Sequence, residues 1–156
     1  MSHVSISKPH HKQEHRTSCL PACAKMLLNF LGDPIEEVTV RDLIGTNRKG
    51  TSAINIIMLN ASLPKIKAEL QHWSLAKLQK FLESKRQPCI VAVKTNLLPY
   101  WKGKAGRHAV VIHGFDDKRV FINDPYYKDK EFRVKIKAFM AAWSALGNIA
   151  ITIERR

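Results

Sequence analysis

The spacing of apolar residues along the chain changes near its midpoint. In the first half, apolar residues recur at intervals of three and four, which is the period of a helix with one buried face. The clearest run begins at a cysteine, and its apolar face comprises Cys19, Cys23, Met26, Leu27, Phe30 and Leu31. Thr17 or Ser18 is expected to cap the first turn, and Gly32 to end the helix. The pattern predicts a helix that starts at or next to Cys19.

The same period predicts further helices before residue 87. A short helix is expected around residues 40–45. A longer one follows Thr51, and its inward face would comprise Ile54, Ile57, Met58 and Ala61. Another covers residues 74–86, with an inward face of Leu75, Leu78, Phe81 and Leu82 and with lysine and glutamate outside.

The second half is rich in β-branched residues, and its apolar runs are bounded by proline, glycine and aspartate. Strands are expected in residues 88–95, 108–117, 118–125, 131–136 and 148–155. FDDKR, residues 115–119, predicts a tight hairpin turn, and residues 137–146 a short helix. Helices first and an antiparallel sheet afterwards are typical of a segregated α+β fold.

Length and composition fit one domain. The chain has 156 residues, of which 45% are hydrophobic, and no repeat or linker divides it. We expect a single domain over residues 1–156, with residues 1–12 as an extended lead-in. Three cysteines without a secreted-scaffold spacing favour reduced thiols, and the N-terminal segment has no apolar signal core. Since no apolar run could span a bilayer, we expect a soluble, cytoplasmic protein that does not contact membranes.

Net charge is the unusual property. Lys+Arg number 26 against 13 Asp+Glu, which gives +13 at neutral pH. Part of the excess lies in KTNLLPYWKGKAGR, which contains Lys94, Lys102, Lys104 and Arg107 and no acidic residue. Such a segment could dock nucleic acid or an acidic protein, or could simply be a solvated surface.

Cys19 is placed where a thiol can be activated. The unsatisfied N–H groups and the dipole of a helix N-terminus favour the thiolate, which is the nucleophilic form. A thiolate also needs an imidazole partner and a group that orients the imidazole. His108 opens one expected strand and Asp124 ends the next, so a hairpin would bring them together. Gln13, six residues before Cys19, could offer its amide to an oxyanion hole.

Each of these residues also has a purely structural interpretation. Cys19 could be a small apolar residue on a helix, and Cys23 and Cys89 are assigned to the core. His108 could be a half-buried strand histidine, and Asp124 could begin a turn before proline. Gln13 alone indicates nothing.

The other histidines allow two further interpretations, an alternative general base and a metal site. His113 is an alternative base, but in a regular strand it faces the side opposite to His108. His3, His10, His11 and His15 could bind a metal, but Cys-x3-Cys without a second clustered pair is a poor zinc pattern. We therefore expect no metal and no cofactor.

Several motifs taken in order resemble a known family. The order Gln-x5-Cys-x-Pro-Ala-x3-Met, then GTS, then HAVVIHGF and a strand ending in NDP is similar to that of the bacteriocin-processing cysteine peptidases. These are papain-like domains that cut leader peptides after a double glycine. The resemblance covers most of the chain. It implies a papain-like fold in which Cys19 is the nucleophile, His108 the general base, Asp124 the group that orients the imidazole and Gln13 part of the oxyanion hole.

The chain departs from that family next to the nucleophile. Where the family often has Asp-Cys-Gly, this chain has Ser18-Cys19-Leu20. Leu20 is expected to narrow or reshape the cleft relative to glycine. The transmembrane and ATPase portions of the transporter-linked members are also lacking.

The leading hypothesis is a soluble papain-like cysteine peptidase acting on a peptide or protein substrate. One alternative is a basic nucleic-acid-binding effector or RNase toxin on the same fold, with the lysine-rich segment before His108 as its docking surface. A weaker alternative is a non-catalytic module that holds an extended peptide.

Overall fold

The structure, a computed structural model, describes residues 3–6 and 10–156. Its helices are α1 (Cys19–Phe30), α2 (Glu37–Leu43), α3 (Leu59–Ser62), α4 (Leu75–Lys85) and α5 (Ile136–Ser144). The 3₁₀ helices are η1 (Ala53–Met58), η2 (Thr95–Leu97) and η3 (Pro99–Trp101). None of the helices in this part of the chain is long and apolar enough to cross a membrane.

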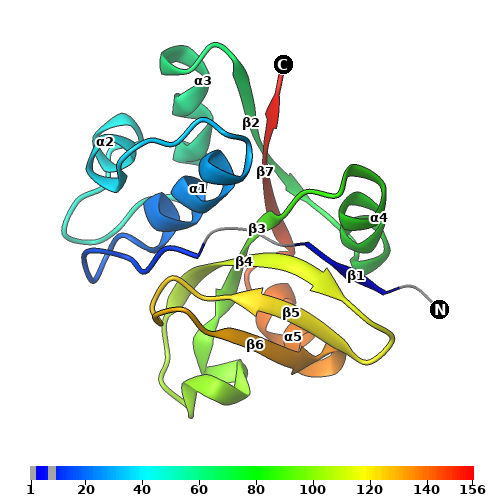
Figure 1. Cartoon of the computed structure of the whole chain (residues 1–156). Coiled ribbons are helices and arrows are strands. Elements are labelled where there is room, and N and C mark those ends of the chain that lie inside the picture. Colours follow the sequence, from blue (N-terminus) through cyan, green and yellow to red (C-terminus); the bar gives the residue numbers. More distant parts are fainter. Residues whose placement is uncertain (1–2, 7–9) are drawn as a thin grey trace.

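The strands form one antiparallel sheet (Figure 1). They are β1 (Val4–Ser5), β2 (Ile66–His72), β3 (Cys89–Lys94), β4 (Arg107–Phe115), β5 (Arg119–Asn123), β6 (Glu131–Lys135) and β7 (Ile149–Arg155). The order is β2-β7-β3-β4-β5-β6, and β1 pairs with β4. Helices in the first half and an antiparallel sheet mainly in the second confirm the predicted α+β class.

Each face of the sheet carries its own core, because side chains alternate along every strand. On one face, Ile90, Val111 and Ile151 pack against α1, α2 and the segment of η1 and α3. On the other face, Val91 and Val110 pack against α4 and α5. α1 therefore lies across the face opposite to α5, and its first turn lies over the first residues of β4 (Figure 1).

The structure differs from the sequence expectation for the first half in two places. Residues 66–72 form β2, an edge strand that the helical pattern did not predict. After Thr51 the chain forms η1 followed directly by the short helix α3 instead of one α-helix, and the buried residues are Ile56 in η1 and Leu59 in α3. Ile54, Ile57 and Met58 are 50%, 45% and 48% exposed, because a 3₁₀ helix with three residues per turn buries a different set of positions.

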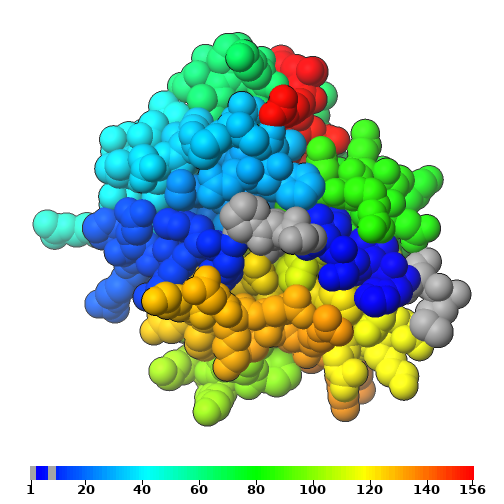
Figure 2. Space-filling view, in the orientation of Figure 1, coloured from blue at the N-terminus to red at the C-terminus, as the bar shows by residue number. Residues whose placement is uncertain are grey.

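The lead-in is more structured than predicted. Residues 4–5 form β1, which pairs with Gly114 and Phe115 of β4. A side chain at Gly114 would overlap the carbonyl oxygen of Val4, so only glycine lets β1 approach. The expectation for residues 1–2 and 7–9 lies outside the described residues. Residues 10–18 run between the helices of the first half and the strands of the second (Figure 2).

Candidate active site

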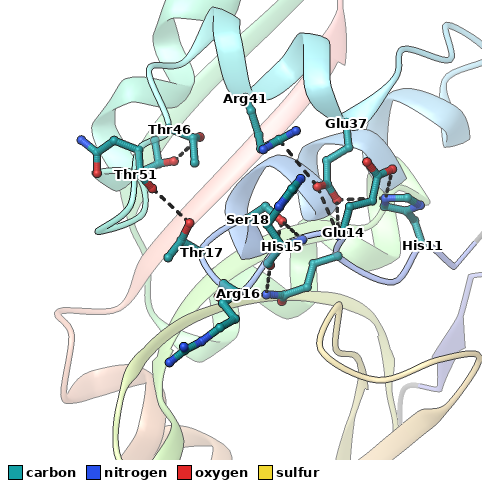
Figure 3. Close-up of polar contacts among 12 residues, drawn as sticks. His11, Glu14, His15, Arg16, Thr17, Ser18, Glu37, Arg41, Thr46 and Thr51 are labelled. Carbon is teal, nitrogen blue, oxygen red and sulfur yellow. Dashed lines mark hydrogen bonds and ion pairs between the residues drawn. The ribbon is translucent and has the colours of Figure 1, made fainter.

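Cys19 is the first residue of α1, and the turn before it leaves the helix end open. Ser18 occupies the N-cap position, but its hydroxyl donates to the carbonyl of His15 and accepts from the backbone N–H of His15 (Figure 3). Thr17 donates its hydroxyl to the carbonyl of Asn47. Ser18 thus takes the predicted N-cap position, but neither Thr17 nor Ser18 gives the helix a side-chain cap. In the first turn, the backbone N–H of Leu20 interacts with the Cys19 thiol.

The Cys19 thiol forms a hydrogen bond with the His108 imidazole. Burial acts to raise the pKa of Cys19, but the hydrogen bond and charge of His108 and the backbone N–H groups of Ala109 and Leu20 lower it, and the net direction is down. Burial likewise acts to lower the pKa of His108, but its bonds to Asp124 and Cys19 raise it to about 9. These opposite shifts favour a thiolate–imidazolium pair.

Asp124 fixes the orientation of that imidazole. His108 is the second residue of β4, and Asp124 follows the last residue of β5, so the hairpin brings them together as predicted. The His108 Nε2 atom lies 2.6 Å from Asp124 Oδ1, which leaves Nδ1 for the Cys19 sulfur. Burial acts to raise the pKa of Asp124, but its bond to His108 and others lower it, so the carboxyl remains ionised.

Two further residues hold Asp124, and the sequence interpretation missed both. Tyr100 donates its hydroxyl to Asp124 Oδ2 at 2.8 Å, and Trp101 donates its indole N–H to the same oxygen at 3.0 Å. The backbone N–H of Tyr126 bonds to Oδ1 at 3.0 Å. Together with His108, these donors occupy both oxygens of the fully buried Asp124 carboxylate. A buried carboxylate without such partners would strongly destabilise the fold.

Tyr100 and Trp101 lie in the segment that was interpreted as a basic surface. Trp101 also contacts the His108 ring edge to face, with centroids 5.1 Å apart, and Tyr100 stacks on Phe132 at 3.8 Å. The only sequence signal for this role was a pair of aromatic residues with polar tips that interrupts a lysine-rich segment.

Gln13 is buried, with 7% of its surface exposed, and lies beside the Asp124 turn. Its backbone N–H donates to the carbonyl of Pro125 at 2.7 Å. Its side-chain amide donates to the carbonyls of His15 and Arg16, and Oε1 is buried without a partner among the described residues. The amide therefore braces the turn that leads to Cys19. Its part in an oxyanion hole stays a prediction, since one N–H would have to turn toward a substrate oxygen.

A buried carboxylate joins this lead-in to α2. Glu37 is fully buried and accepts the backbone N–H of Glu14 with both oxygens, at 3.1 and 3.2 Å (Figure 3). His11 Nε2 lies 3.0 Å from Glu37 Oε1, and Arg41 Nε lies 3.9 Å from Oε2. On the opposite side, His10 Nε2 lies 2.6 Å from the carbonyl of Tyr127. The lead-in is thus bonded both to the helical half and to the turn after Asp124.

His11, Glu14 and Glu37 form the one group of potential metal ligands in the described part of the chain. Glu37 already accepts N–H groups with both oxygens, and a cationic side chain, Arg41, lies next to it. These contacts within the protein are sufficient to explain why His11, Glu14 and Glu37 lie close together.

An open cleft of about 780 Å³ adjoins the Cys19–His108 pair. Apolar side chains form much of its lining, namely Leu20, Ile54, Leu70, Ala92, Ala109, Leu146, Ile149 and Ile151. Leu20 follows Cys19 directly and lines the cleft.

His113, Cys23 and Cys89 lie away from this cleft. His113 is buried near Glu131, with Nε2 3.3 Å from Oε2, at an irregularity in the pairing of β4 with β5. Cys23 and Cys89 are fully buried in the two cores, and burial raises the pKa of Cys89. The basic residues Lys94, Lys102, Lys104 and Arg107 are all exposed, as a surface role requires.

A thiol at a helix N-terminus, facing an imidazole and a carboxylate on a neighbouring sheet, is the arrangement of papain-like cysteine peptidases. Residues 5–151 match the model of the Peptidase_C39 like family, and the chain belongs to this family.

Solved structures share the fold over the whole chain. A double glycine motif protease from an AMS/PCAT transporter, solved in complex with its leader peptide, matches with a TM-score of 0.74 and 21% identity over 100% of both chains. A protein described as a C39-like peptidase from Bacillus anthracis matches with a TM-score of 0.79 and 18% identity, over 100% of this chain and 99% of that one. The peptidase domain of Streptococcus ComA, a bi-functional ABC transporter involved in quorum sensing, matches with a TM-score of 0.76 and 23% identity over 94% and 97%. The papain-like fold is therefore established.

A curated relative is YvpB of Bacillus subtilis (strain 168), an uncharacterized protein. It is 31% identical in an alignment of 101 residues that covers 56% of this chain. The matched region spans only 39% of that protein.

Proposed function

We propose that the protein is a cysteine peptidase that cleaves a peptide bond with Cys19 as nucleophile. The observation that carries the proposal is the Cys19–His108 pair, in which the pKa of the thiol is lowered and that of the imidazole is raised to about 9. A buried structural cysteine shows the opposite shift, as Cys89 does. Membership of the Peptidase_C39 like family supports the same reaction class.

The reaction follows from this geometry. The Cys19 thiolate attacks the carbonyl carbon of the scissile bond, and the carbonyl oxygen becomes an oxyanion near the first turn of α1. The His108 imidazolium then donates its proton to the leaving amine as the C–N bond breaks, which leaves a thioester. In the second half, His108 takes a proton from water, the resulting hydroxide attacks the thioester, and the C–S bond breaks to give the carboxylic acid and regenerate the thiolate–imidazolium pair.

In this mechanism Asp124 keeps the His108 ring oriented and favours its protonated form. Gln13 would contribute an amide N–H to the oxyanion after turning away from the backbone. We also propose that Leu20, as a branched residue beside the nucleophile, changes which residues fit next to the scissile bond. Peptides with and without a double glycine before the scissile bond would test whether this protein cleaves after that motif.

Thiol labelling tests the proposal directly. Iodoacetamide at neutral pH should modify Cys19 faster than Cys23 or Cys89, because only Cys19 is both accessible and ionised. Replacing His108 by alanine should slow the labelling of Cys19, since the thiol then loses the cation that lowers its pKa. Equal labelling of all three cysteines, or no effect of His108→Ala, would contradict an activated nucleophile.

Turnover of a peptide library provides the second test. Cys19→Ala should lower kcat/KM by at least about 1,000-fold, while Cys23→Ala should retain the chemistry if the protein folds. Turnover that survives Cys19→Ala would show that the mechanism is wrong. A labelled Cys19 without turnover of any peptide would instead favour the non-catalytic peptide-binding module. The alternative hypothesis of a nucleic-acid-binding effector is supported only by the net positive charge of the chain.

A further inference from the structure

The charged residues that line the cleft all have the same sign. Arg16 comes from the lead-in, Lys49 from the loop before η1, and Arg107 from the first position of β4. No aspartate or glutamate lines the cleft in the described part of the chain. Three cations from three separate segments therefore border the cleft that contains Cys19 and His108; we call them the cationic rim.

The rim cations are exposed and have no carboxylate of the described chain as a partner. None of Arg16, Lys49 and Arg107 forms an ion pair with a described carboxylate. In Figure 3 the Arg16 guanidinium points away from the group around Glu37. Other cations of the chain do pair with acids, for example Lys67 with Glu69 and Lys85 with Glu154.

The sheet adds a further positive charge next to the rim. Lys94 of β3 and Arg107 of β4 are direct cross-strand partners, so their side chains lie on the same face. Two residues along on that face, Ala92 and Ala109 line the cleft. A like-charge pair placed directly opposite is unfavourable unless an anion neutralises it. A carboxylate bound at the rim would supply that neutralising charge.

We propose that the cleft selects peptides that carry an acidic side chain close to the scissile bond, with the cationic rim as the binding site for that carboxylate. The inference rests on the proposed peptidase function and deepens it. The apolar lining, which includes Leu20, Leu70 and Ile149, contacts apolar side chains of the peptide, and the rim contacts its acidic ones. Because the rim is solvent-exposed, it mainly affects how fast the peptide associates and how the peptide is aligned in the cleft, and salt weakens this effect.

Matched fluorogenic peptides test the inference. Starting from any cleaved sequence, Glu, Gln or Lys is placed in turn at each residue flanking the scissile bond, and kcat/KM is measured. At one or more positions Glu should exceed Gln by roughly fivefold to tenfold, with Lys lowest, and added salt should shrink the difference. Equal values for Glu and Gln at every position would overturn the inference and leave the peptidase proposal intact.

Charge reversal supplies the residue-level test. Arg107→Glu or Lys49→Glu should remove the preference for Glu, and each should cleave the Lys peptide better than the unmodified protein does. Lys80→Glu is the matched control, since Lys80 lies beside Phe115, at the opposite end of β4 from His108. If Lys80→Glu has the same effect as Arg107→Glu, only net charge matters and the rim is not a site.

Binding to the Cys19→Ala variant separates this inference from the proposed function. If the variant binds the Glu peptide more tightly than the Gln peptide although the intact protein cleaves nothing, the rim stands and the peptidase proposal fails. If a short single-stranded RNA displaces the Glu peptide and binds more tightly, the rim is a nucleic-acid surface and the inference is overturned.

Discussion

The two sides of the candidate active site are built in different ways. On the sheet side, both oxygens of Asp124 are occupied by donors from His108, Tyr100, Trp101 and the backbone of Tyr126. On the helix side, Cys19 is placed by α1 and by a lead-in that contacts several separate segments through both side-chain and backbone groups. The sheet side is a closed hydrogen-bond network, and the helix side is an assembly of separate segments.

The difference separates two tasks. The sheet side fixes one imidazole in one orientation and charge state, for which a network with every partner supplied is suited. In the proposed mechanism the helix side accepts the substrate, and there the helix end has no side-chain cap and the Gln13 Oε1 atom has no partner in the described chain. Changes on the sheet side should therefore alter the chemistry, and changes on the helix side should alter how well the thiol and oxyanion donors are positioned.

Among the residues that support the Cys19–His108 pair, the largest effect is expected for Asp124→Ala. Without the carboxylate, His108 loses both its orientation and the group that stabilises its protonated form, so kcat/KM should fall by about 100-fold or more. Steady-state kinetics with a peptide substrate measures this loss in kcat/KM. Tyr100→Phe is the graded control, because it removes one donor to Asp124 and leaves the others. A loss from Tyr100→Phe as large as that from Asp124→Ala would mean that the aromatic residues do more than hold Asp124.

The pH profile should report the sheet side separately. The active form needs a Cys19 thiolate and a protonated His108, so kcat/KM should rise with pH through the lowered pKa of Cys19 and fall again near pH 9, where His108 loses its proton. Burial acts to lower the pKa of His108, and Asp124 counteracts this. In Asp124→Asn the alkaline fall should therefore move to lower pH. A fall that stays near pH 9 would show that Asp124 does not set the charge state of the imidazole.

Sequence patterns predicted the sheet side only in part. A hairpin that starts at His108 and ends at Asp124 follows from strand composition and the turn FDDKR, which are local signals. Tyr100 and Trp101 could not be found in this way, since they reach Asp124 from a loop of 3₁₀ turns whose path depends on tertiary packing. The edge strand β2 was missed for a different reason: Ile66, Ala68 and Leu70 alternate with polar residues, which is a strand signal that the helical interpretation of the first half overlooked.

On the helix side, the position of Cys19 at the first residue of α1 was predictable from apolar periodicity. The absence of a side-chain cap was not predictable. The Ser18 hydroxyl bonds to the backbone of His15 instead, and the apolar pattern of the helix does not reveal this partner. Glu37 was also missed. An acidic residue at the start of a short helix is ordinarily a surface residue that favours the dipole, and only the folded lead-in buries it.

The smallest effect on activity is expected for Glu37→Gln, and it distinguishes the two sides most sharply. The change keeps the size of the side chain but replaces one acceptor oxygen by a donor opposite the N–H of Glu14 and near Arg41. The free energy of unfolding should fall by about 1–3 kcal/mol, and kcat should fall severalfold because Gln13 is less well held. Thermal unfolding and kinetics of the purified variant measure both.

The exposed neighbour Glu36 gives the matched control, and Glu36→Gln should change neither quantity. The alkaline limb near pH 9 should be unaffected in Glu37→Gln, since His108 and Asp124 are untouched. Distant sites without shared partners act independently. If Glu37→Gln moves that limb as Asp124→Asn does, the lead-in and the His108–Asp124 hairpin form one coupled unit, and the two sides of the site cannot be treated as separate parts.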